Sequence, residues 1–199
     1  MTPFTTLTAV AVPVDLANVD TDQIIPARFL GRSRAEQVAG MFHDLRNDPE
    51  GRPRPDFVLN RREFADARIL VADRNFACGS SRENAVTTML DNGFRAFVAP
   101  SFGDIFFNNC FQNGVLPIRL PDARVAAIRA ALNARPGATM TVDLVAQTIV
   151  GPDGVTDRFE VDPFRRDCLL NGVDEIGLTL SCSDRIAVYE ARRAVEDAA

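Results

Sequence analysis

The residues best suited to chemistry lie in one segment, residues 73–84 (DRNFACGSSREN). An apolar run of strand type precedes this segment and a helical pattern follows it, and open α/β sheets place their ligand sites at such junctions. Gly79 lets the backbone approach a ligand, the free N–H groups of a helix start carry partial positive charge, and Arg82 can grip a carboxylate with two hydrogen bonds. The segment therefore predicts an anion site.

Ser80 has two compatible interpretations. With Glu83 three residues later it predicts a capping box, in which each side chain bonds the other residue's backbone N–H. A serine hydroxyl at a helix start beside an arginine also sits where an alkoxide is stabilised, which a serine base requires. Cys78 is a rival nucleophile, but it needs a general base, and the only histidine, His43, lies far away in the sequence.

A second polar segment, residues 18–31 (NVDTDQIIPARFLG), has Asp20 and Asp22 on either side of Thr21. Two aspartates ahead of an apolar run are typical of Asx turns and helix caps. Three arginines crowd the same region and are candidates for further anion contacts: Arg28, Arg32 and Arg34. Residues 101–110 hold large apolar side chains at helical spacing and predict core, with Asn108 and Asn109 as the candidates for a site.

The composition excludes several classes of chemistry. All 22 cationic side chains are arginine, so a Schiff-base enzyme and a phosphate-loop NTPase, which need lysine, cannot be built. One histidine cannot form a multi-histidine zinc site. The net charge of −5 argues against a nucleic-acid partner.

The cysteine spacing indicates whether this chain holds a metal, and the N-terminal residues indicate where the protein is located. The closest pair, Cys168 and Cys182, is separated by thirteen residues, which predicts neither a disulfide framework nor a metal site in this chain. The first residues lack a signal-peptide pattern, and no segment approaches the roughly 18 apolar residues that span a bilayer. We expect a cytoplasmic protein that does not bind membranes.

The elements that must position these residues alternate between strand and helix patterns. The predicted strands are 68–73, 94–99 and 116–120, and the predicted helices are 82–92, 101–113 with Ser101 as N-cap, and 121–134. After these come a β-hairpin of 139–150 and 155–161, a helix of 162–172, and a helix of 183–196 capped by Ser183. We predict a single α/β domain over residues 1–199, with a parallel core, β structure at both ends and a mobile loop around 31–55.

These segments, in this order, resemble the small subunits of 3-isopropylmalate dehydratases, in the aconitase superfamily. The motifs that carry the resemblance cover nearly the whole chain: 13–26, 56–60, 78–83, 93–95, 99–102, 108–110, 114–117, 162–166, 169–172 and 177–179. The fold that the resemblance implies is the swivelling β/β/α domain, like the aconitase C-terminal domain, with a mixed sheet. The activity it implies is a hydro-lyase of leucine biosynthesis that interconverts 2-isopropylmalate and 3-isopropylmalate through a dehydrated intermediate.

The resemblance also implies a partner and roles for particular residues. A larger subunit would carry a [4Fe-4S] cluster that acts as a Lewis acid on the substrate, and this chain would hold no cofactor. By position, Ser80 resembles the catalytic base, Ser81 and Arg82 resemble contacts to a substrate carboxylate, and Asp22 resembles a further polar residue of the site. Arg28, ahead of Arg32, resembles the substrate arginine of the following loop.

Two departures from the family pattern bear on the substrate. The usual Ser-Ser-Arg-Glu-His ends in Asn84 here, and the loop 31–48, which in this superfamily helps to choose the substrate side chain, differs from the commonest bacterial form. Alternatives are therefore the small subunit of a related dehydratase, for homoaconitate, citraconate or dimethylmaleate, or an anion-binding module without catalysis.

Overall fold

One mixed sheet organises the molecule, which is known from a computed structural model that describes residues 1–196. Its strands are β1 (Thr6–Val14), β2 (Ala67–Ala72), β3 (Ala96–Ala99), β4 (Leu116–Arg119), β5 (Thr139–Asp143), β6 (Thr148–Val150) and β7 (Thr156–Arg158). Among the described residues they lie in the order β4-β3-β2-β1-β5-β6-β7. The first four are mutually parallel, and β5, β6 and β7 are antiparallel to their neighbours.

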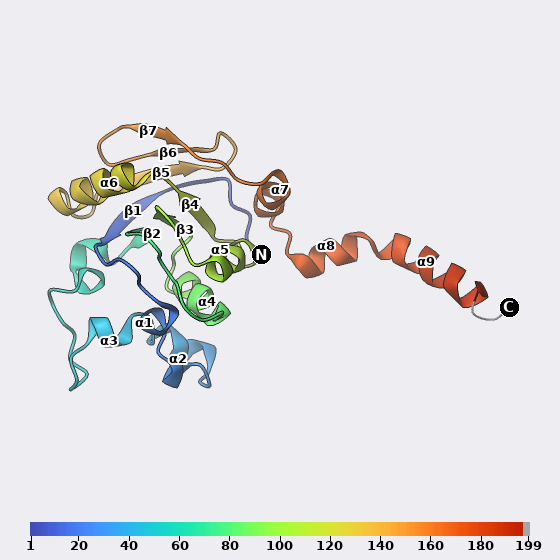
Figure 1. Cartoon of the computed structure of the whole chain (residues 1–199), viewed down its shortest axis with the longest axis horizontal. Coiled ribbons are helices and arrows are strands. Elements are labelled where there is room, and N and C mark those ends of the chain that lie inside the picture. Colours follow the sequence, from blue (N-terminus) through green and yellow to red (C-terminus); the bar gives the residue numbers. More distant parts are fainter. Residues whose placement is uncertain (197–199) are drawn as a thin grey trace.

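The helices occupy the connections and the C-terminal end. They are α1 (Thr21–Ile24), α2 (Arg34–Val38), α3 (His43–Arg46), α4 (Glu83–Asp91), α5 (Asp104–Gln112), α6 (Asp122–Ala134), α7 (Pro163–Asn171), α8 (Glu175–Ser181) and α9 (Ser183–Glu196). Figure 1 shows α4 and α5 beneath the parallel strands, and α6 beside β5 and β6 on the other side. Short 3₁₀ turns lie at Ala27–Phe29, Val58–Asn60 and Arg62–Phe64.

Both faces of the parallel strands are covered, so successive side chains of one strand enter two different cores. In β2, Leu70 and Ala72 join the core that contains the buried faces of α4 and α5. Ile69 and Val71 join the core that contains α6 and the antiparallel strands. A strand buried on both faces reads as a continuous apolar run, which explains why the sequence around residues 67–72 shows no polar alternation.

Most of the predicted elements are confirmed. The parallel strands β2, β3 and β4 and the helices between them lie within two or three residues of the expected positions. The turn 151–154 joins β6 to β7 as predicted, and α7 begins after Asp162, whose carboxylate accepts from the N–H of Arg165. Gly172 ends α7 in the left-handed conformation, with a φ of 66°. The single-domain organisation and the mobility of residues 31–55 stay predictions.

Other expectations were wrong. Residues 139–150 form two strands rather than one, because Asp143 accepts a hydrogen bond from the N–H of Ala146 and turns the chain between β5 and β6. Ser101 does not cap α5, since its hydroxyl accepts from the N–H of Asn75, and Gly103 occupies the N-cap position. Helix α8 was not predicted, although Asp174 caps it through the N–H of Gly177.

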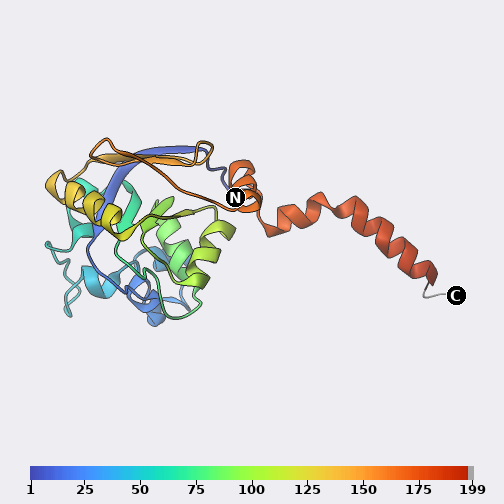
Figure 2. The same ribbon diagram turned by 45° about the horizontal axis from the view of Figure 1, so that its top comes forward.

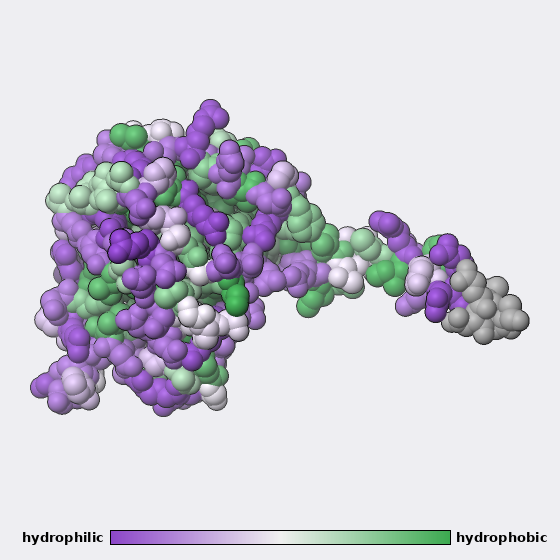
Figure 3. Space-filling model, viewed as in Figure 1, coloured by the Kyte–Doolittle hydropathy of each residue, from purple (hydrophilic) through white to green (hydrophobic). Residues whose placement is uncertain are grey.

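The α8 and α9 helices project away from the sheet as an arm (Figures 1 and 2). Every side chain of α9 from residue 183 to residue 193 is exposed. Apolar side chains are exposed along the arm as well (Figure 3): Ile176, Leu180, Ile186, Val188 and Tyr189. Among the described residues, no helix combines the length and the apolar character that crossing a bilayer requires.

Deleting residues 183–199 should change the midpoint of thermal unfolding by no more than about 2 °C, because α9 buries no described side chain against the sheet. As a control, Leu169→Ala removes a fully buried side chain of α7 and should destabilise the chain by about 2–5 kcal/mol. Differential scanning calorimetry of both variants checks this. A drop after the deletion as large as that of Leu169→Ala would show that α9 supports the core.

Candidate functional site

The two polar segments that the sequence singled out leave the sheet at the same edge. Because β1 and β2 are parallel neighbours, the chain that follows each strand emerges from the carboxyl end of the sheet. Beyond the strands the pairing continues as an isolated parallel bridge between Asp20 and Cys78. The N–H of Cys78 donates to the carbonyl of Val19 at 3.1 Å, and the N–H of Thr21 donates to the carbonyl of Cys78 at 3.0 Å. Residues about 60 positions apart are thereby held side by side.

The loop 75–79 is shaped by an unusual backbone. Asn75 and Ala77 both have a φ of 56°, and Gly79 has a φ of 91°. Left-handed conformations cost a non-glycine residue roughly 1–2 kcal/mol, so the surroundings must impose them. Phe76 lies between Asn75 and Ala77 in the chain and is fully buried, so its packing imposes these conformations. Its ring packs edge-on against Phe106, with 5.7 Å between the ring centroids.

A close backbone approach fixes the same loop from the other side. Phe76 pairs with Phe102 in a parallel bridge, and the N–H of Gly103 donates to the carbonyl of Phe76. A Cβ atom at Gly103 would lie 2.3 Å from the carbonyl oxygen of Ala77, which no side chain tolerates. Glycine is therefore required here, and the loop that leads to Ser80 rests directly on the start of α5.

Ser80 is exposed at this edge, and its hydroxyl contacts Thr21. The two side-chain oxygens are 2.9 Å apart, and the Thr21 hydroxyl is also 3.3 Å from the carbonyl oxygen of Ser80. The predicted capping box was wrong: α4 begins at Glu83, its N-cap is Arg82, and no side chain caps it. Glu83 instead accepts from the amide of Asn113. The Ser80 hydroxyl therefore does not cap the start of α4.

Arg82 and Asp22 form an ion pair across the two segments. Nη1 of Arg82 donates to the carboxylate of Asp22 and, at 3.4 Å, to the carbonyl of Ile25. The Arg82 side chain is 21% exposed and that of Asp22 is 58% exposed, so the pair lies at the rim of the site. Asp20, by contrast, has the capping role expected of it, since it forms a capping box with Gln23 at the start of α1. Ser81 is exposed between Ser80 and Arg82.

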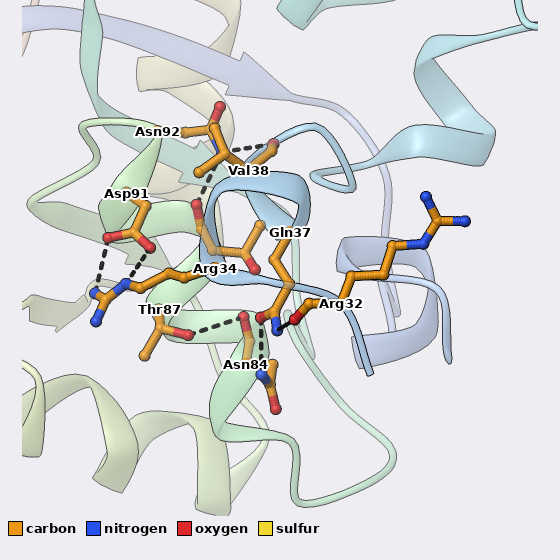
Figure 4. Close-up of polar contacts among 9 residues, drawn as sticks. Arg32, Arg34, Gln37, Val38, Asn84, Thr87, Asp91 and Asn92 are labelled. Atoms are coloured by element: carbon orange, nitrogen blue, oxygen red, sulfur yellow. Dashed lines mark hydrogen bonds and ion pairs between the residues drawn. The ribbon is translucent and has the colours of Figure 1, made fainter. Parts of the chain in front are cut away.

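The predicted loop arginines, Arg28 and Arg32, make their side-chain contacts within their own segment, residues 28–44, and none of these contacts is to Ser80. Arg28 forms a two-pronged ion pair with Asp44, and its Nη2 lies 3.0 Å from Nδ1 of His43. Arg32 is exposed, and its Nε donates to the carbonyl of Arg28 at 3.3 Å. Both guanidinium groups lie over the ring of Phe29, at 5.1 Å from its centroid. In this structure the Arg28 guanidinium is therefore paired with Asp44, whereas the Arg32 side chain extends away from Gln37 and Asn84 (Figure 4).

Asn84 links the start of α4 to the loop that carries these arginines (Figure 4). Its side-chain amide donates to Oε1 of Gln37 at 2.9 Å, and Nε2 of Gln37 donates to the carbonyl of Arg32 at 3.0 Å. Further along α4, Asp91 accepts two hydrogen bonds from Arg34. Sequence reasoning noted Asn84 only as a departure from a motif. The structure makes it one of several contacts between α2 and α4, beside Arg34 with Asp91 and Asn92 with the carbonyl of Val38.

Arg129 on α6 is a supporting residue that sequence reasoning missed. It donates to Asp15 at 2.6 Å and to Asp73 at 2.9 Å, the residues that follow β1 and β2. The side chain is 14% exposed, and Asn133 adds a contact to Asp15 at 2.8 Å. One arginine thus ties together the ends of both strands that lead into the site. Its helical context in the sequence carries no signal for this role.

The cysteines do not fit a metal cluster. Cys110 is fully buried in α5, and burial raises the pKa of its thiol well above the ordinary value. Cys78 lies in the site loop, with its sulfur 3.6 Å from the carbonyl oxygen of Asn18, and no base stands beside it in the contacts of this loop. In the part of the chain that the structure describes, no group of three or more His, Cys, Asp or Glu side chains is placed to hold a metal ion.

One hollow in the surface lies away from Ser80. It has a volume of about 460 Å³ and is lined by residues of α5, α7 and α8, including Phe111, Phe164, Cys168 and Leu178. Asn108, a candidate from the sequence, lines it too and accepts a hydrogen bond from Arg165 at 2.8 Å. None of the residues around Ser80 contributes to it. Ser80 and Ser81 are themselves exposed.

Comparison with known proteins gives consistent matches over almost the whole chain. The profile of the aconitase C-terminal domain matches residues 1–123, and that of the LeuD_N domain matches residues 126–163. A 3-isopropylmalate dehydratase small subunit from Rhodospirillum centenum is 57% identical over 197 residues, 98% of this chain and 97% of that protein. One from Paramagnetospirillum magneticum is 52% identical over 194 residues, 97% of this chain and 96% of that protein.

A solved structure is similar as well. The crystal structure of 3-isopropylmalate dehydratase from Methanocaldococcus jannaschii superposes with a TM-score of 0.65 at 24% sequence identity. The match covers 94% of this chain and 99% of that chain. At this identity the likeness bears on the fold alone.

The Arg28 contact predicts a measurable titration. Hydrogen bonding from Arg28, with a smaller contribution from His43, lowers the pKa of Asp44 to about 2. Because this value lies below the ordinary one of about 4, Asp44 favours the folded state above pH 4 and loses that effect as the pH falls toward 2. Arg28→Ala should return the pKa of Asp44 toward 4, and His43→Ala should raise it less. Carboxyl NMR titration distinguishes these results, and an unchanged pKa in Arg28→Ala would contradict the pairing.

Proposed function

This chain belongs to the family of 3-isopropylmalate dehydratase small subunits, and we propose that its Ser80 edge is the half of the active site that this subunit contributes. The protein is accordingly a hydro-lyase subunit of leucine biosynthesis. The observation that carries the site assignment is the junction of the two polar segments. There Ser80, whose hydroxyl caps no helix, lies at one exposed edge of the sheet with the ion pair of Arg82 and Asp22.

In the proposed reaction, Ser80 exchanges a proton with substrate carbon. For dehydration, Oγ of Ser80 takes the proton from the carbon next to the one that bears the hydroxyl group, the C–H electron pair forms the double bond, and the hydroxyl group leaves. Rehydration returns a proton to one carbon and a hydroxyl group to the other. Addition in the opposite sense converts 2-isopropylmalate into 3-isopropylmalate.

Arg82 and Ser81 are proposed to hold a carboxylate of the substrate. A guanidinium group has five N–H donors, and the ion pair with Asp22 together with the bond to Ile25 uses donors of Nη1. A carboxylate can accept two parallel hydrogen bonds from such a group. Asp22 keeps Arg82 at the rim of the site, and the exposed hydroxyl of Ser81 lies beside it.

Arg32 is the loop arginine best placed to join the substrate contacts in this conformation. Arg28 was ranked first from the sequence, but its guanidinium is paired with Asp44. Arg32 is exposed and is linked to the start of α4 through Gln37 and Asn84. We assign both to the substrate side of the site, with Arg28 acting once Asp44 releases it.

The exposure of Ser80 and Ser81 supports a site completed by another chain. A family of small subunits implies a large subunit as partner. The cysteines of this chain do not fit a cluster, so the [4Fe-4S] group that the resemblance implies would belong to that partner. We further propose that the enzyme acts in the cytoplasm and binds neither nucleic acid nor membranes.

Reconstitution tests the enzyme assignment. The chain is mixed with a cluster-loaded large subunit, and the alkene intermediate is followed by ultraviolet absorbance with a panel of 2- and 3-substituted malates. The highest kcat/KM is expected for 2- and 3-isopropylmalate. Preference for homoaconitate, citraconate or a dimethyl-substituted malate would instead assign the chain to a related dehydratase. No turnover with any acid, together with retained binding, would leave the anion-binding module.

Ser80→Ala tests the base. General acid–base groups contribute about 10²- to 10⁴-fold to rate, so kcat of the reconstituted enzyme should fall by about that factor. Assembly with the large subunit, measured by gel filtration, should stay normal. The matched control is Ser183→Ala in the exposed arm, which should leave kcat unchanged. Full activity of Ser80→Ala would remove Ser80 from the mechanism.

A further inference from the structure

Thr21 is a buried polar side chain with a specific partner in the site. It is 1% exposed, and Thr88 is the other buried polar side chain among the described residues. The hydroxyl of Thr88 has no hydrogen-bond partner, whereas that of Thr21 lies 2.9 Å from the hydroxyl of Ser80. Buried polar groups are normally hydrogen-bonded, and the side-chain partner of this buried hydroxyl is the exposed serine of the proposed site.

The backbone prevents Thr21 from moving away from Ser80. Its N–H donates to the carbonyl of Cys78, and its carbonyl accepts from the N–H of Ile25. The preceding residue, Asp20, is held by the capping box with Gln23, with distances of 2.7 and 2.9 Å. Thr21 therefore stands at a fixed position under Ser80, and its β-branched side chain has few rotamers.

The Thr21 hydroxyl has one proton and two neighbouring oxygen atoms that can accept it, the carbonyl oxygen and the hydroxyl oxygen of Ser80. It can donate to the carbonyl oxygen of Ser80 at 3.3 Å, and the Ser80 hydroxyl then donates to Thr21. When Ser80 is an alkoxide it has no proton to donate, and rotation about the Cβ–Oγ1 bond of Thr21 turns the proton toward the Ser80 oxygen. A hydrogen bond to the charged form stabilises that form, and burial strengthens it.

We propose that Thr21 is a positioning residue for the reaction: its hydroxyl fixes the Ser80 side chain and donates to the Ser80 oxygen when that oxygen is deprotonated. The inference rests on the proposed role of Ser80 as base. It adds a second group to that role, from a segment 59 residues away in the sequence.

The charged groups around Ser80 do not make this donor redundant. Arg82 favours an alkoxide, but its charge is balanced by the ion pair with Asp22. Asp20, whose carboxylate is used in the capping box, disfavours an alkoxide. Cys78 and Glu83 lie on either side of Ser80 along the chain, and Glu83 is turned toward Asn113. A neutral donor is thus the group in direct contact with the reacting oxygen.

Thr21→Val in the reconstituted enzyme is the principal test, because valine keeps the β-branched shape and removes the hydroxyl. Losing a hydrogen bond to a charged oxygen should lower kcat about 10- to 100-fold with little change in KM. The limb of the pH–rate profile on which the rate rises with pH should move up by about one to two pH units. Thr21→Ser keeps the hydroxyl and should stay within a few-fold of the parent in rate and profile.

The matched control is Thr88→Val, which removes the other buried threonine hydroxyl and should leave kcat and the pH profile unchanged. Circular dichroism checks folding, and Thr21→Ala serves as a second variant without the hydroxyl. An unchanged kcat and profile in either folded hydroxyl-free variant overturns the inference, as does a Thr21→Ser variant as impaired as Thr21→Val. Ser80→Ala separates the two proposals: its full activity overturns both, while its inactivity beside a normal Thr21→Val overturns this one alone.

Discussion

The parallel pairing of β1 with β2 is the constraint on which the site depends. It brings the carboxyl ends of the two strands together, and the backbone bonds of Val19, Cys78 and Thr21 extend it beyond the strands. Neither polar segment is a site by itself: one carries Ser80 and Arg82, and the other carries Thr21 and Asp22. Opposite charges and paired hydroxyls come within hydrogen-bond distance only because the register aligns Asp20 with Cys78.

Several independent contacts keep that junction rigid. The left-handed residues of the loop 75–79 are imposed by the packing of Phe76 and by the approach of Gly103 to Ala77. Arg129 joins the ends of both strands from the opposite side of the sheet. The proton acceptor that we propose at Ser80 would benefit from these contacts, because small displacements of a reacting group lower the rate steeply.

Much of the fold followed from the sequence. The apolar runs of β2, β3 and β4, the glycines after α4 and α7, and the turn 151–154 are local signals, and each was found where it was expected. The swivelling β/β/α fold class, expected from the resemblance, is confirmed by the matched domain profile and the similar solved structure. The predicted helix cap at Ser80 was wrong for a physical reason. A capping signature is local, but the Ser80 hydroxyl found a partner on another segment.

What the sequence determined by itself is the inventory: arginine as the only side-chain cation apart from one histidine, a polar segment with Ser80 and Arg82 ahead of a helix, and a polar turn around Thr21. Only the tertiary structure decided which side chains contact one another. Arg82 pairs with Asp22, Arg28 pairs with Asp44, Asn84 reaches Gln37, and Thr21 lies under Ser80. Local propensities act over a few residues, whereas strand register aligns residues about 60 positions apart, and that register emerges only when both faces of the sheet are buried.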